Sequence, residues 1–395
     1  MPSGKEDRSP SGHRWARALG QRVHGLTTVA TGRKVQVGAA IAIITALCLP
    51  SEACAAEQRD PGRVLVGVNY FAGWWESLPN KWHGKGWSTN EPDWRPQFPG
   101  RVPLLGEYND QPTMDREIAA AADHGVDFFS ILWYFPRPGT PHEVTGKLLN
   151  RGLDCFLAST NSGRMRFMIE YCNATVYRAT NEVGWASCVK PWVAAMKHPS
   201  YLRVDGRPIF KVHGADQFLR THDRDLDLCR RRLDHLRAAA REAGVGEVCV
   251  GGGIMAANTV KPAYLVARLF DFTATYMSVP DAGPREEEFP YAVLAEPARE
   301  ARSSHAGDPI PWMPYLAAGW NPRPWTHPKA DDHHRTFFKF PTREEWAAEL
   351  RAIKNDFKKF PRLGLPRADG TCQPAFTIYA WNEFGEGGKI GRAHV

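Results

Sequence analysis

The chain has 395 residues, of which 43% are hydrophobic and 24% charged, so it has ample material for a large core. One barrel domain of about 250 residues or more has an ordinary size, and nothing requires a second catalytic domain. The formal charge of +7 includes seven basic and three acidic residues in positions 1–56, which leaves +3 for the remainder. This weak basic balance says little about partners, and we expect no nucleic-acid partner.

The amino terminus is typical of an export signal. Residues 1–34 are polar and Arg-rich, Val35–Leu49 is apolar, and the small-residue run Ala53–Ala56 follows. This order predicts a secretory signal peptide that is cleaved after Ala55 or Ala56. A membrane anchor is the alternative, but the apolar run is shorter than the roughly 20 residues that a spanning helix needs. We therefore expect a periplasmic or extracellular protein with no stable membrane insertion after cleavage.

From Val64 onward, short apolar runs alternate with amphipathic ones, a pattern that favours parallel strands joined by helices. Helices are predicted at Thr113–His124 and Thr342–Phe360, the second with a capping box of Thr342 and Glu345. Eight strands followed by crossovers predict an α/β protein of the (β/α)8 TIM barrel type. The predicted strands are Val64–Phe71, Val126–Tyr134, Arg166–Tyr171, Pro208–His213, Glu247–Gly251, Phe272–Met277, Ile310–Leu316 and Phe376–Trp381.

Two long connections are expected at the carboxyl face of this barrel, where active sites of the fold are built. They span Glu76–Pro112 and Trp320–Pro341. Tryptophans concentrate in or beside the first connection, beginning with Trp74, and they offer the flat apolar faces that sugar rings need. Packing at the barrel rim is the alternative for each tryptophan. The triple glycine Gly251–Gly253 lacks the rest of a nucleotide-binding pattern and predicts a close backbone approach.

The most informative stretch is the last predicted strand, which ends at two glutamates, Glu383 and Glu386, among glycines. Glycosidic cleavage needs one carboxyl group to protonate the leaving oxygen and another to act as a base or nucleophile. The glycines allow a sharp turn, so both acids can face one pocket. We therefore predict that they are catalytic. A polar turn whose acids pair with Arg or Lys is the alternative.

Further candidates lie at the ends of other strands. His213 and Tyr276 end the fourth and sixth predicted strands and would face the same mouth, and Asn382 precedes the first glutamate. Each of the first two is alternatively a rim residue with its hydrogen bonds satisfied.

The end motif Trp381–Gly387 resembles the signature of the glycoside hydrolase family 99-like domain, which is related to the endo-alpha-mannosidases and shared with polysaccharide-cluster proteins long labelled glycosyltransferases. The resemblance covers Val64 to about Lys389. Other segments match the family less closely but occur in the expected order along the chain. They are Val68–Phe71, Pro103–Tyr108, His124–Phe129, Trp133–Tyr134, Asp205–Pro208 and Gly319–Asn321.

The resemblance implies a retaining (β/α)8 enzyme for α-linked glycans, typically mannosides, that uses no metal or other cofactor. It implies that Glu383 helps the substrate's own 2-hydroxyl group to attack the anomeric carbon, and that Glu386 acts as acid and then as base. Characterised endo-mannosidases have His directly before the second acid, whereas Gly385 stands here. Together with the residues above, the resemblance gives a set of substrate-binding candidates. They are Tyr70, Trp74, Tyr108, Trp133, Tyr134, Glu170, Tyr171, His213, Tyr276, Trp320, Trp381 and Asn382.

Two rival functions remain open from the sequence. One is a carbohydrate-binding barrel without turnover, and the other is glycosyl transfer in surface-polysaccharide assembly. An oligosaccharide or polysaccharide is the expected partner in each case.

The last six residues, Ile390–Val395, match one reading frame of a common short-read sequencing adapter. We expect that the native chain was cut near Lys389, so that the barrel is truncated after its eighth strand. The predicted organisation is therefore an extension with a signal peptide at 1–56, a hydrolase-like domain at 57–389 and an artefact at 390–395.

Overall fold

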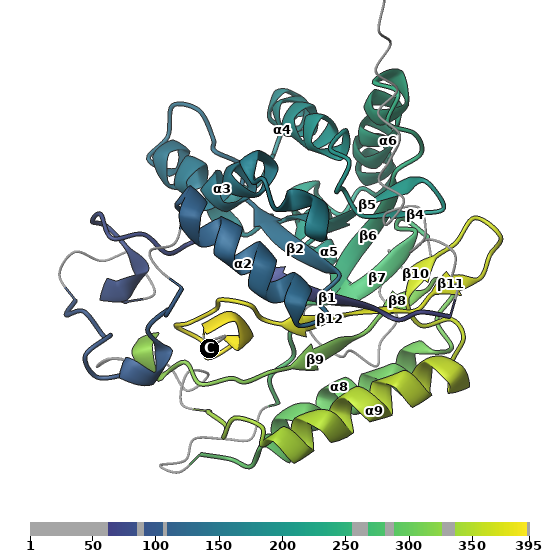
Figure 1. Ribbon diagram of the computed structural model, residues 1–395. Helices are drawn as coiled ribbons and strands as arrows, with labels where there is room; N and C mark the ends of the chain where they lie inside the picture. The colour runs from purple at the N-terminus through teal and green to yellow at the C-terminus, as the bar shows by residue number, and fades with distance from the viewer. Residues whose placement is uncertain are drawn as a thin grey trace, which may run out of the picture. The chain divides into compact units, whose positions relative to one another are not determined.

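The computed structural model describes residues 62–84, 91–105, 109–254, 268–280, 288–325 and 336–392. Its principal element is a barrel of parallel strands surrounded by helices (Figure 1). The barrel strands are β1 (Leu65–Tyr70), β2 (Phe128–Trp133), β3 (Arg166–Tyr171), β5 (Arg207–Val212), β6 (Cys249–Ile254), β7 (Phe272–Thr275), β8 (Trp312–Met313), β9 (Tyr315–Ala317) and β12 (Ala375–Tyr379).

The sheet closes through an interrupted strand. β8 pairs with β7, and β9 pairs with β12, while only Pro314 separates β8 from β9. Proline cannot donate a backbone hydrogen bond, so it divides one strand position into two short pieces. The Pro314 carbonyl still accepts from the Thr377 amide at 3.0 Å, which keeps the two neighbours in register. The predicted (β/α)8 barrel is confirmed, and all eight predicted strands are present in the described residues.

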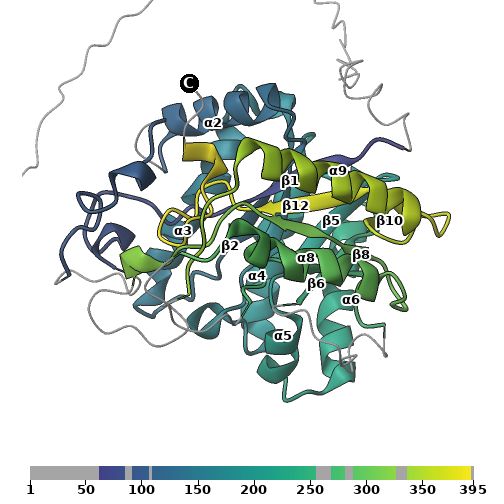
Figure 2. The same cartoon turned by 90° about the horizontal axis from the view of Figure 1, so that it is seen from below.

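Helices pack on the outside of the barrel wall, as α2 and α3 do over β1 and β2, and α8 and α9 do below β9 (Figures 1 and 2). The predicted capping box is present, because Thr342 and Glu345 exchange side-chain to backbone hydrogen bonds at the start of α9. The helices are α2 (Gln111–Asp123), α3 (His142–Ala158), α4 (Glu182–Met196), α5 (Ala215–Thr221), α6 (Leu226–Glu242), α8 (Tyr291–His305) and α9 (Arg343–Lys359).

The barrel interior is filled at its amino-terminal end by one apolar layer. Side chains alternate between the two faces of a strand, so the residues two positions further along each strand form the next inward layer. A short strand, β4 (Arg203–Val204), and the hairpin of β10 (Leu365–Pro366) and β11 (Cys372–Gln373) contribute to this end. The layer contains Leu65, Phe128, Met168, Leu202, Val204, Ile209, Cys249, Phe272, Ala274, Met313, Leu365 and Ala375.

The glycine run of β6 makes the close approach that the sequence predicts. A Cβ atom on Gly251 would lie 2.3 Å from the Phe272 ring, and one on Gly253 would lie 1.8 Å from the His213 carbonyl oxygen. Bulkier residues therefore do not fit on this strand. No helix among the described residues is long and apolar enough to cross a bilayer.

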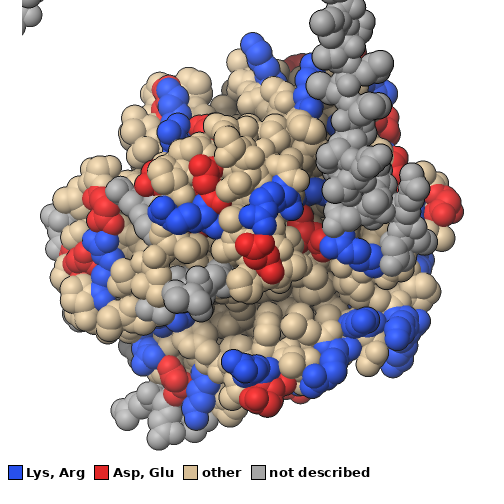
Figure 3. All heavy atoms as spheres, viewed as in Figure 1, with Lys and Arg blue, Asp and Glu red and all other residues tan. Residues whose placement is uncertain are grey.

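Acidic and basic side chains are interspersed on the face shown in Figure 3. Ion pairs at the protein surface include Lys147 with Glu143, whose charged atoms lie 2.7 Å apart on α3. The predicted signal peptide, Tyr108 and the last three residues lie outside the described residues.

Candidate active site

A buried ionic cluster lies inside the barrel, one layer above the apolar floor. Glu170 on β3 and Lys211 on β5 are direct partners in the parallel register, and both are fully buried. Glu170 Oε1 lies 2.8 Å from the Lys211 ammonium and 2.6 Å from His213 Nδ1. Its other oxygen accepts from Ser130 at 2.7 Å and from Asn69 at 3.3 Å.

This cluster fixes the charge of Glu170. Burial by itself would raise the pKa of Glu170, but the Lys211 ammonium and the His213 ring lower that pKa to about 2. Both carboxylate oxygens of Glu170 already have protein partners, so this fully buried side chain holds the His213 ring in place. The predicted substrate contact by Glu170 is not supported, because its side chain is fully buried, whereas the His213 side chain is 13% exposed.

The two candidate catalytic acids lie on a tight turn that follows β12. The Glu383 carbonyl accepts from the Glu386 amide at 3.1 Å and from the Gly387 amide at 2.9 Å. Gly387 has a φ of 92°, a conformation that glycine adopts without a steric penalty. The Glu386 carbonyl accepts from the Asn321 amide at 2.6 Å, which ties the turn to the connection after β9.

The two acids interact electrostatically. Burial, and then the negative charge of Glu386, raise the pKa of Glu383 to about 8. Glu383 is 5% exposed and accepts from the Tyr276 hydroxyl at 2.9 Å, while Glu386 accepts from the Tyr379 hydroxyl. Around neutral pH Glu383 therefore keeps a proton, and acid catalysis needs a carboxyl group in this state.

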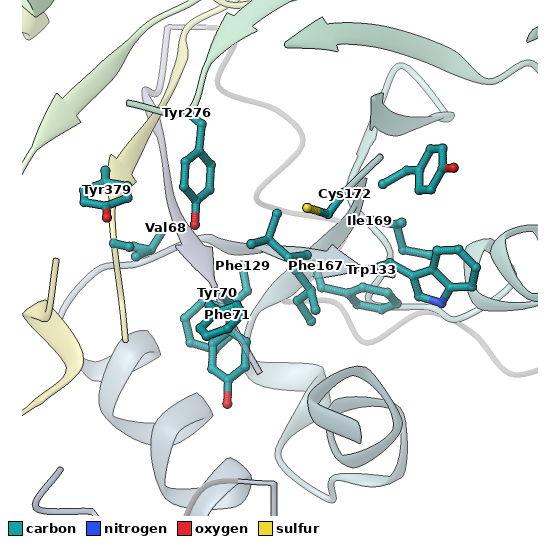
Figure 4. Packing of buried hydrophobic residues seen from close by; sticks show 14 of the residues in the cluster. Val68, Tyr70, Phe71, Phe129, Trp133, Phe167, Ile169, Cys172, Tyr276 and Tyr379 are labelled. Carbon is teal, nitrogen blue, oxygen red and sulfur yellow. The ribbon is translucent and has the colours of Figure 1, made fainter. Parts of the chain in front are cut away.

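The two tyrosines come from the barrel wall. Tyr379 ends β12, Tyr276 follows β7, and their rings meet edge to face with centroids 5.3 Å apart (Figure 4). The His213 ring packs against Tyr276 at 4.8 Å. Burial raises the pKa of both tyrosines well above the usual value, so both keep their protons and remain donors.

Two further predicted residues lie near the pair. Tyr134 is 7% exposed, and the charge of Glu383 contributes, after burial, to the raised pKa of its phenol. Trp320 is partly exposed, and its ring lies 6.2 Å from that of Tyr379.

Asn382 supports the turn from behind. Its side-chain oxygen accepts from the Phe71 amide at 2.8 Å, and its carbonyl accepts from the Trp74 indole at 2.6 Å. Trp74 is fully buried and packs against Trp82 at 4.5 Å. The sequence assigned Trp74 to substrate binding. The structure corrects this position, because the ring is enclosed by other rings and presents no exposed surface.

Tyr70 and Trp381 are also structural in their contacts. The Tyr70 hydroxyl and the Trp381 indole donate to the two oxygens of Glu117, at 2.6 and 2.8 Å. Glu117 lies on α2 and is fully buried, so this carboxylate joins the helix to the first and last barrel strands. Both predicted binding residues therefore point away from the barrel interior.

Trp133 and Tyr171 occupy the outer face of the barrel wall. Their ring centroids lie 5.2 and 4.9 Å from that of Trp192 on α4. Figure 4 shows Trp133 well separated from Tyr276. Both side chains are buried, with 5% and 1% exposure. Their role here is to pack α4 against the sheet, so the substrate contacts predicted for them are not supported.

The glycine before the second acid has a structural explanation. A Cβ atom on Gly385 would lie 2.1 Å from Trp325 Nε1, so the indole of Trp325 fills the space that a side chain would need. Sequence reasoning missed Trp325 and also Arg101, whose buried guanidinium donates to the carbonyls of Asn321 and Phe384. Neither position carries a motif that points to the site.

No cluster of three or more His, Cys, Asp or Glu side chains suited to a metal ion is found within the described ranges. The six cysteines from Cys155 to Cys372 are free thiols.

Comparison with known sequences finds no matching family model and no matching curated protein. Solved structures do match. A glycoside hydrolase-like protein is 13% identical with a TM-score of 0.50, and the match covers 83% of this chain and 86% of that one. A GH99 endo-alpha-mannosidase from Bacteroides thetaiotaomicron is 14% identical with a TM-score of 0.49, covering 84% of this chain and 87% of that one. At these identities the likeness concerns the fold.

Proposed function

We propose that this protein is a retaining glycoside hydrolase that cleaves α-linked, mannoside-type glycans. The observation that carries the proposal is the pair of Glu383 and Glu386 on one turn at the carboxyl end of the barrel, where the charge of Glu386 adds to burial in raising the pKa of Glu383. Active sites of (β/α)8 enzymes are built at this end. A solved structure with the same fold is named a glycoside hydrolase-like protein, which supports the proposal.

The proposed reaction starts with Glu383 ionised and Glu386 protonated. Because the raised pKa of Glu383 favours a proton on Glu383 in the free enzyme, binding of the sugar has to move this proton to Glu386 before the first step. As the sugar's 2-hydroxyl oxygen bonds to the anomeric carbon, its proton passes to Glu383, and the bond to the leaving oxygen breaks as Glu386 gives that oxygen a proton. Water then opens the three-membered ring, losing a proton to Glu386 while Glu383 returns its proton to the 2-oxygen. Two displacements at one carbon give net retention, and both acids end as they began.

The surroundings of the pair support sugar binding. Glu383 Oε2 and the side-chain nitrogens of Asn382 and Trp320 have no hydrogen-bond partner among the described residues. Buried polar atoms are usually satisfied, so the partnerless Oε2 of Glu383, in a carboxyl group with a raised pKa, favours a ligand that carries hydroxyl groups. His213, oriented by Glu170, is the further candidate for a sugar hydroxyl.

The test is hydrolysis of a panel of α-linked oligosaccharides, with the anomeric form of the first product followed by NMR. Glu383→Gln and Glu386→Gln should each lower kcat by at least about 100-fold, because general acid or base catalysis contributes roughly 10²–10⁴-fold. Glu300→Gln, an exposed change on α8, is the matched control. Glycan binding by the parent without any cleavage would replace this proposal with the binding-barrel function.

Export through the amino-terminal signal is part of the same proposal. Mass spectrometry of the protein recovered from its natural host should find a mature amino terminus at Ala56 or Glu57. An intact leader on a cytoplasmic protein would instead favour glycosyl transfer, since activated sugars are available there.

A further inference from the structure

Lys81 is held at a fixed place beside the acid pair. It begins the short 3-10 helix η2 (Lys81–His83), which is capped by the Asn80 side chain accepting from the Trp82 amide at 3.0 Å. The Lys81 carbonyl accepts from the Trp94 indole at 2.8 Å. Trp82 and Trp94 are both nearly fully buried, so the backbone at Lys81 is anchored in packed aromatic rings.

The ammonium group of Lys81 lies between two aromatic faces. Its nitrogen is 4.4 Å from the centroid of Phe71 and 4.8 Å from that of Trp325. Both rings adjoin the catalytic turn, because the Phe71 amide bonds to Asn382 and the Trp325 indole packs on Gly385. Aromatic faces attract a cation, so this sandwich directs the charge to the flank of the turn.

The position matters because burial and the charge of Glu386 both raise the pKa of Glu383. Among the described residues, Lys81 is a cation that lowers the pKa of this carboxyl group. The other titratable groups that interact with Glu383 come from four strand ends and the turn itself. They are Tyr134, Cys172, Tyr276, Tyr379 and Glu386.

We propose that Lys81 is a positioning residue of the acid pair, whose ammonium, clamped between Phe71 and Trp325, stabilises the single negative charge that the two glutamates share. The inference rests on the proposed function for its catalytic meaning. Its physical content concerns the free enzyme. An opposite charge close to a carboxyl group lowers the carboxyl pKa by roughly 1–3 units.

The experiment is a carboxyl titration of the full chain, followed by NMR of protein labelled with ¹³C at the glutamate carboxyl carbon. Glu383→Gln and Glu386→Gln identify the two resonances. Lys81→Met and Lys81→Gln remove the charge, Lys81→Arg keeps it, and Lys147→Met removes an exposed ammonium on α3 as the control. Two neutral variants are used so that poor folding of one does not end the test.

Lys81→Met or Lys81→Gln should move the upper titration of the pair to higher pH by about one unit, the lower end of the range for a nearby charge. Lys81→Arg and Lys147→Met should change the pH of this titration by no more than a few tenths of a unit. A folded neutral variant with an unchanged titration, even with a lower melting temperature, would overturn the proposal, because a cation that only packs between rings leaves the carboxyl groups unaffected. The shift requires no turnover. A shift in a protein that cleaves no glycan would therefore reject the proposed function and keep this one.

Discussion

The Tyr276 hydroxyl and the Glu383 carboxylate form a 2.9 Å hydrogen bond between residues that are 107 positions apart in the chain. This bond joins the end of β7 to the turn after β12, so the barrel itself brings donor and acceptor together. A bond donated to a carboxylate favours its charged form. It therefore opposes the burial that raises the pKa of Glu383 to about 8.

The pH dependence of activity follows from the shared proton. The pair is active with one proton, and this form is present below the raised pKa of about 8 and lost above it. We expect kcat/KM to fall about tenfold per pH unit above that value, and the measurement is a kcat/KM profile from pH 5 to about 10. Activity that stays level to the alkaline end of the profile would contradict a shared proton.

Tyr276→Phe should move the fall of kcat/KM at alkaline pH, the alkaline limb of the profile, to higher pH. Removing a donor to the carboxylate raises the pKa of Glu383, by about one unit, because a hydrogen bond to a charged group contributes roughly 1.5–3 kcal/mol. Tyr201→Phe is the matched control, since it removes a buried hydroxyl that accepts from Ile169 away from the acid pair. If the alkaline limb of the kcat/KM profile lies at the same pH in Tyr276→Phe and in the parent, the hydrogen bond between Tyr276 and Glu383 is absent in solution.

The buried Glu170 predicts an acid-dependent stability. Its pKa is about 2 in the folded protein, below the ordinary 4.5, so its contribution is present above pH 4.5 and is lost as the pH falls toward 2. Glu170→Gln should therefore be less stable than the parent at pH 7 by about 3 kcal/mol, and this deficit should shrink on acidification. Denaturant unfolding of both proteins between pH 7 and 3 measures it, with Glu300→Gln as the control.

Lys211→Met tests the same ion pair from the other side. It leaves the buried Glu170 carboxylate without its ammonium, which costs about 3–5 kcal/mol in the free energy of unfolding. The double variant with Glu170→Gln should lose less than the sum of the single losses, since no buried charge remains without a partner. Additive losses in this double-mutant cycle would mean that the two groups do not interact.

Strand alternation explains which parts of the site were predictable from the sequence. The eight strands and the turn of glutamates were recognisable because long apolar runs end at turn residues. On β3, however, neighbouring residues face opposite sides, so Glu170 and Tyr171 could not both face the interior. The same alternation places Trp133 outward, and counting positions from the inward Phe128 would have shown this.

The residues that sequence reasoning missed come from contacts between distant segments. Glu117 lies on the buried side of a helix, where a carboxylate is rare, and that rarity is a usable signal for a partner such as Trp381. Lys211, within the buried run of β5 that follows Arg207, gives the same kind of signal. Lys81 and Trp325 give none. Their position depends on how two long connections fold over the turn, and local patterns do not encode that.

The contact between Trp325 and Gly385 gives a final prediction, because it shows why the turn carries no side chain between its acids. Gly385→Ala would place a methyl group 2.1 Å from the Trp325 indole nitrogen, so the ring must move. Overpacking of this kind costs about 1–3 kcal/mol. The displaced ring would also release the Lys81 ammonium that it faces. We therefore expect lower kcat, altered tryptophan fluorescence and an alkaline limb of the kcat/KM profile at higher pH.

Gly163→Ala, where a Cβ atom meets nothing within 4 Å, is the matched control and should behave as the parent. Parental fluorescence, stability and pH profile in Gly385→Ala would mean that Trp325 does not occupy this space in solution.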